Sequence, residues 1–223
     1  IPGKNSLFAI ILSEIKKLIV SKSVTVKDVL IKQTDYKQGS AMPNVNDGFS
    51  PFKNGDKWGF GADKHCWFYS KVDFEKVEGK RCELLASTNR QGWDARNPQF
   101  MLYIDGEIVQ GMDVNHTTAV IKDFGKKDVF LYAYTGTNVI PNDYKNFDFN
   151  APLDLNLKVI YIDEDVERLY YNMQVLTDVL EFTDINSLEY SLITTALNDT
   201  VNYLDMRNPD SQEFIDSVKK AND

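Results

Sequence analysis

Polar side chains gather in the short stretch "QGMDVNH", residues 110–116, which holds one of the two histidines of the chain. Asp113, Asn115 and His116 offer a carboxylate, an amide and an imidazole, which can ligate a metal or hydrogen-bond a ligand. The compact D-x-N-H order lacks the face-sharing spacing of zinc pairs, and calcium prefers more carboxylates and carbonyls than it supplies. The favoured interpretation is a loop in which Asp113 and Asn115 bond their own backbone, with His116 as a hydrogen-bonded edge residue.

Two further stretches carry tryptophans among polar residues. "DKWGFGADKHCWF" contains Trp58, and "NRQGWDARNPQ" contains Trp93 followed by Asp94. A loop tryptophan flanked by polar side chains can stack on a sugar ring or anchor a domain interface. The alternative is a tryptophan folded down to close the end of a β-sandwich. The candidates for a carbohydrate or domain-interface site are Trp58, Trp93, Asp94, Gln110, Asp113, Asn115 and His116.

Motifs of covalent catalysis and phosphate binding are missing from the sequence. No G-x-S-x-G nucleophile turn occurs. Cys66 follows His65, but neighbouring residues of a strand point to opposite faces and cannot form a local dyad. The glycines of "GFGADKH" precede a strand rather than a helix, so they do not predict a phosphate cradle. With 33 acidic residues a pair of carboxylates is always available, so no catalytic residue and no metal ligand are predicted.

Charge and hydropathy narrow the classes of partner. The formal charge is −8, and no cluster of basic residues suits phosphates, so neither nucleic acid nor an anionic membrane is a predicted partner. No apolar stretch is long enough to span a bilayer. Cys66 and Cys82 lie in strand-like runs without metal-site spacing, which favours a reduced, buried pair in a cytoplasmic protein over a disulfide.

Eight short apolar runs between residues 24 and 162, mostly separated by turn residues, predict a β-sandwich or jelly roll. In "LDLNLKVIYI" apolar and polar residues alternate, as in a strand with one buried face. "DVFLYAY" is apolar on both faces, which predicts a central strand covered on both sides. Asp105-Gly106 supplies a two-residue hairpin turn with positive φ angles.

Helical spacing marks both ends of the chain. Apolar residues recur at helical intervals between residues 7 and 19, and the charges among them argue against a signal peptide. After residue 163 the helical period returns, with Asp184 or Ser187 and then Asp210 or Ser211 as helix caps. The predicted organisation is an N-terminal helix at 1–22, a β-sandwich at 23–162 and a helical linker at 163–223. Exposed apolar surface is expected on the terminal helices.

Several segments together resemble the N-terminal region of α-mannosidases of glycoside hydrolase family 38, in the bacterial and cytosolic branch. They are "WGFGADKHCWFYSKVDF", "EGKRCELLAS", "GWDARNPQFMLYIDGEIVQGMDVNHTTAVI" and "VFLYAYTG". The similarity continues through "RLYYNMQVL" and "LNDTVNYLDMRNPDS" and covers most of the chain beyond about residue 25. In that family the region is a galactose-binding-like jelly roll, and a following β/α barrel with a divalent metal, usually zinc, carries catalysis.

The resemblance implies a non-catalytic accessory domain of a cytoplasmic exo-α-mannosidase that retains configuration. None of the family's metal ligands or its nucleophile is matched, so the fragment is expected not to hydrolyse mannosides and to hold no cofactor. Zinc or another divalent metal belongs to the missing catalytic domain. The implied partners are the barrel of the same parent chain, mannose-containing glycans and further copies of the parent. On this hypothesis residues 110–116 face the barrel and order the mouth of the active site or the domain seam.

Two other functions suit the same fold. A stand-alone carbohydrate-binding module predicts that sugar quenches the fluorescence of Trp58 or Trp93. An interaction domain without a sugar role predicts no quenching but tight association with a separate barrel chain. Because jelly rolls host all three classes, the fold alone does not choose among them.

Overall fold

The computed structural model describes residues 2–35, 41–89, 97–136 and 151–223. Contacts within the chain divide it into a helical unit of residues 1–22, 79–81 and 161–223 and a sandwich unit of residues 23–78 and 82–160. The described ranges form these helices and strands: α1 (Pro2–Leu18), β1 (Val20–Thr25), β2 (Leu30–Thr34), β3 (Ser50–Pro51), β4 (His65–Phe74), β5 (Lys80–Ser87), β6 (Gln99–Ile104), β7 (Glu107–Met112), β8 (Thr118–Val120), β9 (Gly125–Tyr134), β10 (Asn156–Asp163), α2 (Glu164–Glu181), α3 (Leu188–Tyr203) and α4 (Gln212–Asn222).

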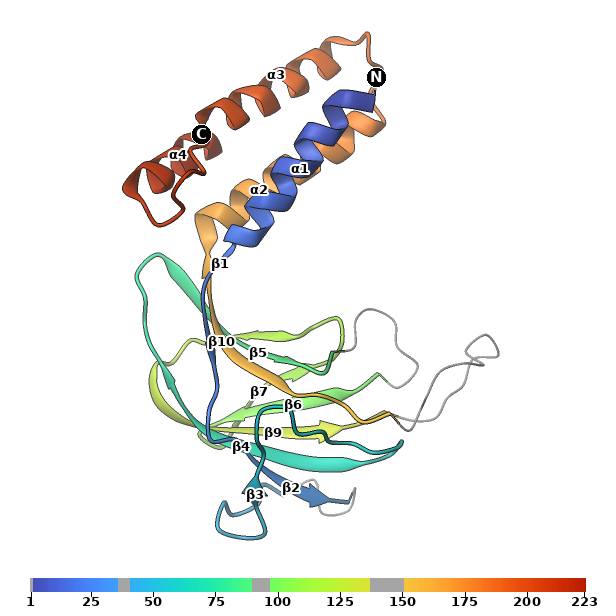
Figure 1. Ribbon diagram of the computed structural model, residues 1–223, viewed down its shortest axis with the longest axis vertical. Helices are drawn as coiled ribbons and strands as arrows, with labels where there is room; N and C mark the ends of the chain where they lie inside the picture. Colours follow the sequence, from blue (N-terminus) through green and yellow to red (C-terminus); the bar gives the residue numbers. More distant parts are fainter. Residues whose placement is uncertain (1, 36–40, 90–96, 137–150) are drawn as a thin grey trace, which may run out of the picture. The chain divides into compact units, whose positions relative to one another are not determined.

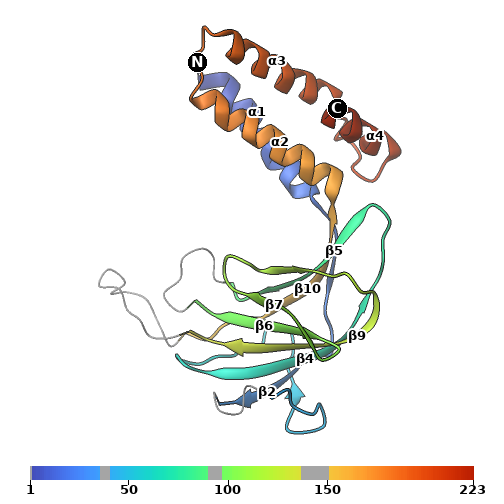
Figure 2. The ribbon, with the colours of Figure 1, turned by 180° about the vertical axis from the view of Figure 1, so that it is seen from behind.

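The strands form two sheets, so the predicted jelly-roll-type β-sandwich is confirmed. One sheet has the order β1-β10-β5-β8, and the other has the order β3-β2-β4-β9-β6-β7 (Figures 1 and 2). Each of the eight predicted apolar runs contains a strand. The first run divides, because Asp28 has a left-handed φ of 53° and separates β1 from β2, which lie in different sheets.

The inner face of the six-stranded sheet carries aliphatic, small and phenylalanine side chains, all buried in the core. The central strand β9 pairs with β4 and β6, and its Val129, Leu131 and Ala133 are fully buried. Cys66 lies on this face of β4, directly opposite Ala133. Cys66 and Cys82 are both buried and neither is in a disulfide, as predicted, and burial raises the pKa of the Cys66 thiol.

The outer face of the same sheet is aromatic. The register sets His65, Trp67 and Tyr69 of β4 opposite Tyr134, Tyr132 and Phe130 of β9, and residues opposite each other share a face. Residues 41–49 cover only part of this face. The prediction that β9 is covered on both sides is therefore confirmed around Phe130 but not at Tyr132 and Tyr134, which are half-buried.

The β6–β7 hairpin turns at Asp105 and Gly106, whose φ angles of 49° and 91° are both positive, as predicted. Along the hairpin Leu102 pairs with Gln110, while Tyr103 pairs with Ile108. One residue of β7 thus has no opposite partner on β6, and this β-bulge shifts which later residues of β7 face outward.

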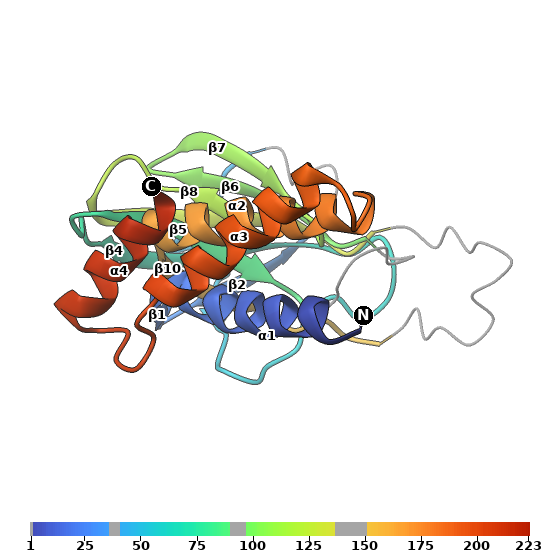
Figure 3. The same ribbon diagram turned by 90° about the horizontal axis from the view of Figure 1, so that it is seen from above.

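The helical unit has a core of its own. α2 packs against α1, α3 and α4, so the N-terminal helix and the C-terminal helices share one core (Figure 3). Ser187 and Ser211 are the N-caps of α3 and α4, each accepting a hydrogen bond from the backbone three residues ahead. None of the described helices is long and apolar enough to cross a lipid bilayer.

The helices also leave apolar side chains in solvent, as the sequence led us to expect. Phe182, just after α2, is 90% exposed. The other exposed apolar residues of the helical unit include Leu7, Ile10, Tyr171, Val175, Val179, Ile185, Leu188 and Leu192.

Candidate functional site

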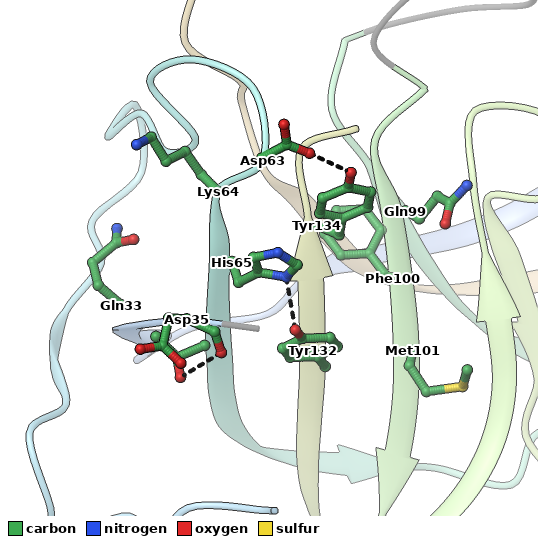
Figure 4. A pocket seen from close by; sticks show the side chains of 11 residues that line it. Gln33, Asp35, Asp63, Lys64, His65, Gln99, Phe100, Met101, Tyr132 and Tyr134 are labelled. Atoms are coloured by element: carbon green, nitrogen blue, oxygen red, sulfur yellow. Dashed lines mark hydrogen bonds between the residues drawn. The ribbon is translucent and has the colours of Figure 1, made fainter. Parts of the chain in front are cut away.

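A pocket of about 860 Å³ lies on the outer face of the six-stranded sheet, within the sandwich unit (Figure 4). It sits at the end of the sheet where β2 and β9 finish and β4 and β6 begin, because Thr34 pairs with His65 and Tyr134 pairs with Gln99. The described residues that line it are Gln33, Thr34, Asp35, Asp63, Lys64, His65, Gln99, Phe100, Met101, Tyr132 and Tyr134.

Three rings from adjacent strands occupy the middle of the lining. The His65 and Tyr134 rings stack with their centroids 4.7 Å apart and their planes 19° apart. The Tyr132 hydroxyl lies 2.7 Å from His65 Nδ1, and these two ring planes differ by 18°. That hydrogen bond therefore holds the His65 and Tyr132 rings next to each other in nearly parallel planes.

The hydroxyl of Tyr134 is held by Asp63. It donates a hydrogen bond of 2.7 Å to Asp63 Oδ1. Burial and the Asp63 carboxylate raise the pKa of Tyr134 to about 12, since both disfavour the phenolate. Tyr134 therefore stays a hydrogen-bond donor at every physiological pH.

The loop that carries Asp63 is tied to the end of β9. Asp63 N donates to Gly136 O at 2.9 Å, and Lys64 N donates to the Thr135 hydroxyl at 3.0 Å. At Gly59, with φ 64°, a Cβ would lie only 2.4 Å from the Thr135 methyl group, so a side chain there would push the loop away. Close backbone packing thus fixes the place of Asp63.

Polar side chains stand on both sides of the rings. Gln33 and Asp35 lie on the β2 side, and Gln99 lies on the β6 side with Met101 (Figure 4). Amides and carboxylates at such positions can exchange hydrogen bonds with the hydroxyls of a ligand whose apolar face rests on the rings. Among the described residues no group of three or more His, Cys, Asp or Glu side chains is arranged to hold a metal ion.

The pocket ends where residues 41–49 begin to cover the sheet. Phe49 packs edge-on against Tyr69 and Phe130, with centroids 6.2 and 6.4 Å apart. Met42 and Val45 pack against the same buried cluster. We call Trp67, Tyr69 and Phe130 with this cover the covered half of the face, and His65, Tyr132 and Tyr134 the open half.

Trp58 is not a surface platform, which corrects its candidacy as a sugar-stacking residue. It is 1% exposed, and its indole Nε1 donates to Asp154 O at 3.0 Å. Its ring packs against Phe68 and Phe100, and its backbone bridges to Leu153. The structure thus agrees with the alternative of a tryptophan that closes the end of the sandwich. Trp93 and Asp94 lie outside the described residues.

Gln110 connects the two sheets. Its Nε2 donates to Thr118 O of β8 at 2.9 Å, and it pairs with Leu102 on the buried face of the hairpin. The amide therefore has a structural partner and does not line the pocket.

Asp113, Asn115 and His116 lie in a loop whose hydrogen bonds are made within the loop itself, which we call the self-bonded loop. Asp113 Oδ1 accepts from the backbone N–H of Asn115 and of His116, both at 2.8 Å, and lies 3.0 Å from His116 Nδ1. Partial burial raises the pKa of Asp113, but these hydrogen bonds outweigh it and leave the pKa below its usual value. None of the three residues lines the pocket, and a role for this loop at a domain seam stays a prediction.

Sequence reasoning missed the residues that do line the pocket, above all His65, Tyr132 and Tyr134. The pattern that could have revealed them is the alternation in "HCWFYSKVDF" and "DVFLYAY". In the parts "HCWFY" and "FLYAY" of these stretches, every second residue carries a ring, and the intervening residues are mostly smaller. An outward aromatic face follows from that alternation once the strands are paired.

No family model matches this chain, and no curated protein matches it. The structure is similar to β-glucuronidase 2 of Bacteroides uniformis, with 12% identity and a TM-score of 0.41, over 62% of this chain and 18% of that one. It is also similar to a family 35 carbohydrate-binding module from Clostridium thermocellum, with 14% identity and a TM-score of 0.29, over 62% of this chain and 95% of that one. A third similar structure is CBM51-2 with INT domains from Clostridium perfringens ZmpB, with 10% identity and a TM-score of 0.30, over 91% and 45% of the two chains. Because these TM-scores and identities are low, the function proposed below rests on the residues of the pocket and not on these similarities.

Proposed function

We propose that the sandwich unit binds carbohydrate in the pocket at His65, Tyr132 and Tyr134. The observation that supports this most is the pair of hydrogen-bonded, nearly parallel rings of His65 and Tyr132, flanked by amide and carboxylate side chains inside one pocket. A pyranose has an apolar C–H face and a rim of hydroxyls, which such a site complements. The volume falls within the roughly 300–1,000 Å³ of pockets that hold drug-sized ligands.

Each side chain has a distinct part in this proposal. His65 and Tyr132 support the apolar face of one sugar. Tyr134 stacks behind His65 and holds Asp63, whose second carboxylate oxygen can accept from a sugar hydroxyl. Asp35 and Gln99 hydrogen-bond the sugar from opposite sides.

The role we propose is binding without hydrolysis, as an accessory domain to a glycosidase. The resemblance to family 38 α-mannosidases is not supported by any match to a family model, and it stays a hypothesis. It makes mannose-containing glycans the first sugars to test and a catalytic barrel the expected partner. The cytoplasmic location and the metal of such a parent remain predictions of that resemblance.

Isothermal titration calorimetry against a panel of neutral sugars tests the proposal. The panel holds α-mannose, β-glucose and β-xylose as methyl glycosides and as short oligosaccharides. We expect the protein to bind at least one class, and Tyr132→Ala to weaken that binding by about tenfold or more, because it removes half of the stacking surface.

Tyr171→Ala is the matched control, since Tyr171 is an exposed tyrosine on α2 in the helical unit. It should leave affinity unchanged. Absence of binding to every sugar in the panel by the folded protein would contradict the proposal and favour an interaction domain without a sugar role.

A further inference from the structure

The outer face of the sheet continues beyond the pocket onto β7, and at Gly111 it carries no side chain. Met101, which lines the pocket, pairs with Gly111 of β7, so both residues belong to the outer face. Gly111 is exposed, and a Cβ placed on it would meet no atom within 4 Å. The surface next to Met101 is therefore open.

The backbone does not explain why residue 111 is a glycine. Gly106 in the neighbouring turn has a φ of 91°, a conformation that favours glycine, whereas Gly111 is a strand residue without a positive φ. A β-branched residue would suit such a strand position better. The effect of a glycine at residue 111 is instead on the surface, because no side chain rises between Met101 and the edge of the sheet.

Along β9 toward Phe130, the open half is bounded by the covered half. Tyr132 contacts Trp67, with centroids 5.1 Å apart, and Trp67 lies in the cluster beneath Met42, Val45 and Phe49. Tyr103, the next outward residue of β6 after Met101, also packs against that cluster. A ligand that rests on Tyr132 and is longer than one sugar can therefore extend over the open surface formed by Met101 and Gly111.

We propose that Met101 and Gly111 form the floor of a second sugar subsite, so that the ligand is a neutral oligosaccharide of at least two sugars lying across β9, β6 and β7. This inference rests on the proposed function of the pocket. The first sugar lies on His65 and Tyr132. The second lies on the polarisable thioether of Met101 and the bare backbone of Gly111, with the Gln99 amide within the same lining as a hydrogen-bonding group.

Gly111→Ile tests the subsite. The added side chain should stand off the sheet in the path of the second sugar, and the variant should fold, because the space is open and isoleucine favours strands. Calorimetry would use the methyl glycoside, disaccharide and trisaccharide of whichever sugar class of the panel the protein binds. Gly111→Ala, with a side chain too short to block the path, is the matched control.

In the unaltered protein we expect the disaccharide to bind about fivefold more tightly than the methyl glycoside, the gain that one net hydrogen bond gives. Gly111→Ile should abolish that gain and leave the methyl glycoside affinity unchanged, whereas Gly111→Ala should keep it. Equal affinity for both ligands in the unaltered protein, or a gain that survives in Gly111→Ile, overturns the second subsite and leaves the proposed function intact. Absence of binding to any sugar overturns both.

Discussion

The two halves of one sheet face use the same kind of residue in different ways. In the covered half Trp67, Tyr69 and Phe130 are buried under residues 41–49 and form a small core. In the open half Tyr132 and Tyr134, on the same strand as Phe130, are half-buried and line a pocket. The difference lies in the cover, residues 41–49, which is distant from β9 in the sequence. An aromatic sheet face is thus core or binding surface according to what lies over it.

The largest expected effect is the loss of stability when an aromatic residue of the covered half is removed. Trp67→Ala should lower the free energy of unfolding by roughly 3–5 kcal/mol, because it leaves a cavity beneath the cover. Tyr132→Ala, at a half-buried position, should have a clearly smaller effect. Urea denaturation of both variants measures the difference, and equal losses would show that the open half is as much a part of the core as the covered half.

A second prediction concerns one tyrosine from each half, Tyr69 and Tyr134. Burial and a carboxylate partner raise the pKa of Tyr69 and of Tyr134 to about 12, the partners being Asp128 and Asp63. An unfolded tyrosine titrates near pH 10. The stabilisation linked to each phenol is therefore fully present below about pH 10 and is lost as the pH rises toward 12.

Near-ultraviolet absorbance as a function of pH measures this titration. We expect Tyr69 and Tyr134 to ionise near pH 12, about two pH units above an unfolded tyrosine. Asp63→Asn should lower the pKa of Tyr134 and leave that of Tyr69 unchanged. If every tyrosine titrated near pH 10, neither hydroxyl would be held as the structure places it.

The smallest expected effect is in the self-bonded loop outside the pocket. Asp113→Ala removes hydrogen bonds to two backbone N–H groups and should destabilise the protein by roughly 1 kcal/mol. Because the pKa of Asp113 is lowered, its contribution is present above the usual aspartate pKa and is lost as the pH falls through the lowered value. Asp113→Asn, which keeps an acceptor oxygen, is the control, and sugar affinity should not change in either variant. A loss of affinity in Asp113→Ala would assign this loop to the site.

Local sequence patterns predicted the fold class and most of its elements. The alternation in "LDLNLKVIYI", the Asp105-Gly106 turn and the serine caps at Ser187 and Ser211 are determined by residues near each other in the chain. Each therefore predicted its element before any tertiary contact was known. The division of the first β run at Asp28 was missed, because the run is apolar on both sides of a single residue with positive φ.

The candidate site could not be predicted in the same way, because it depends on pairing. His65 and Tyr134 become neighbours only through the register of β4 with β9. Trp58 looked like a loop platform because its partners Leu153 and Asp154 lie far along the chain, and only the folded structure buries it between them. Residues 110–116 were predicted as candidates from their polar composition. In the structure, Gln110 instead donates a hydrogen bond to β8, and Asp113 accepts hydrogen bonds from the backbone of its own loop.

Methyl-labelled methionine provides the most direct test that sugar binds in the open half of the face. Met101 lines the pocket, Met42 belongs to the cover over the other half, and Met112 is buried on the opposite face of the sheet. On titration with the best-bound oligosaccharide of the panel, we predict that the Met101 methyl resonance shifts while those of Met42 and Met112 stay in place. Binding that leaves Met101 unmoved, or that moves Met42 instead, would contradict the assignment of the open half as the carbohydrate site.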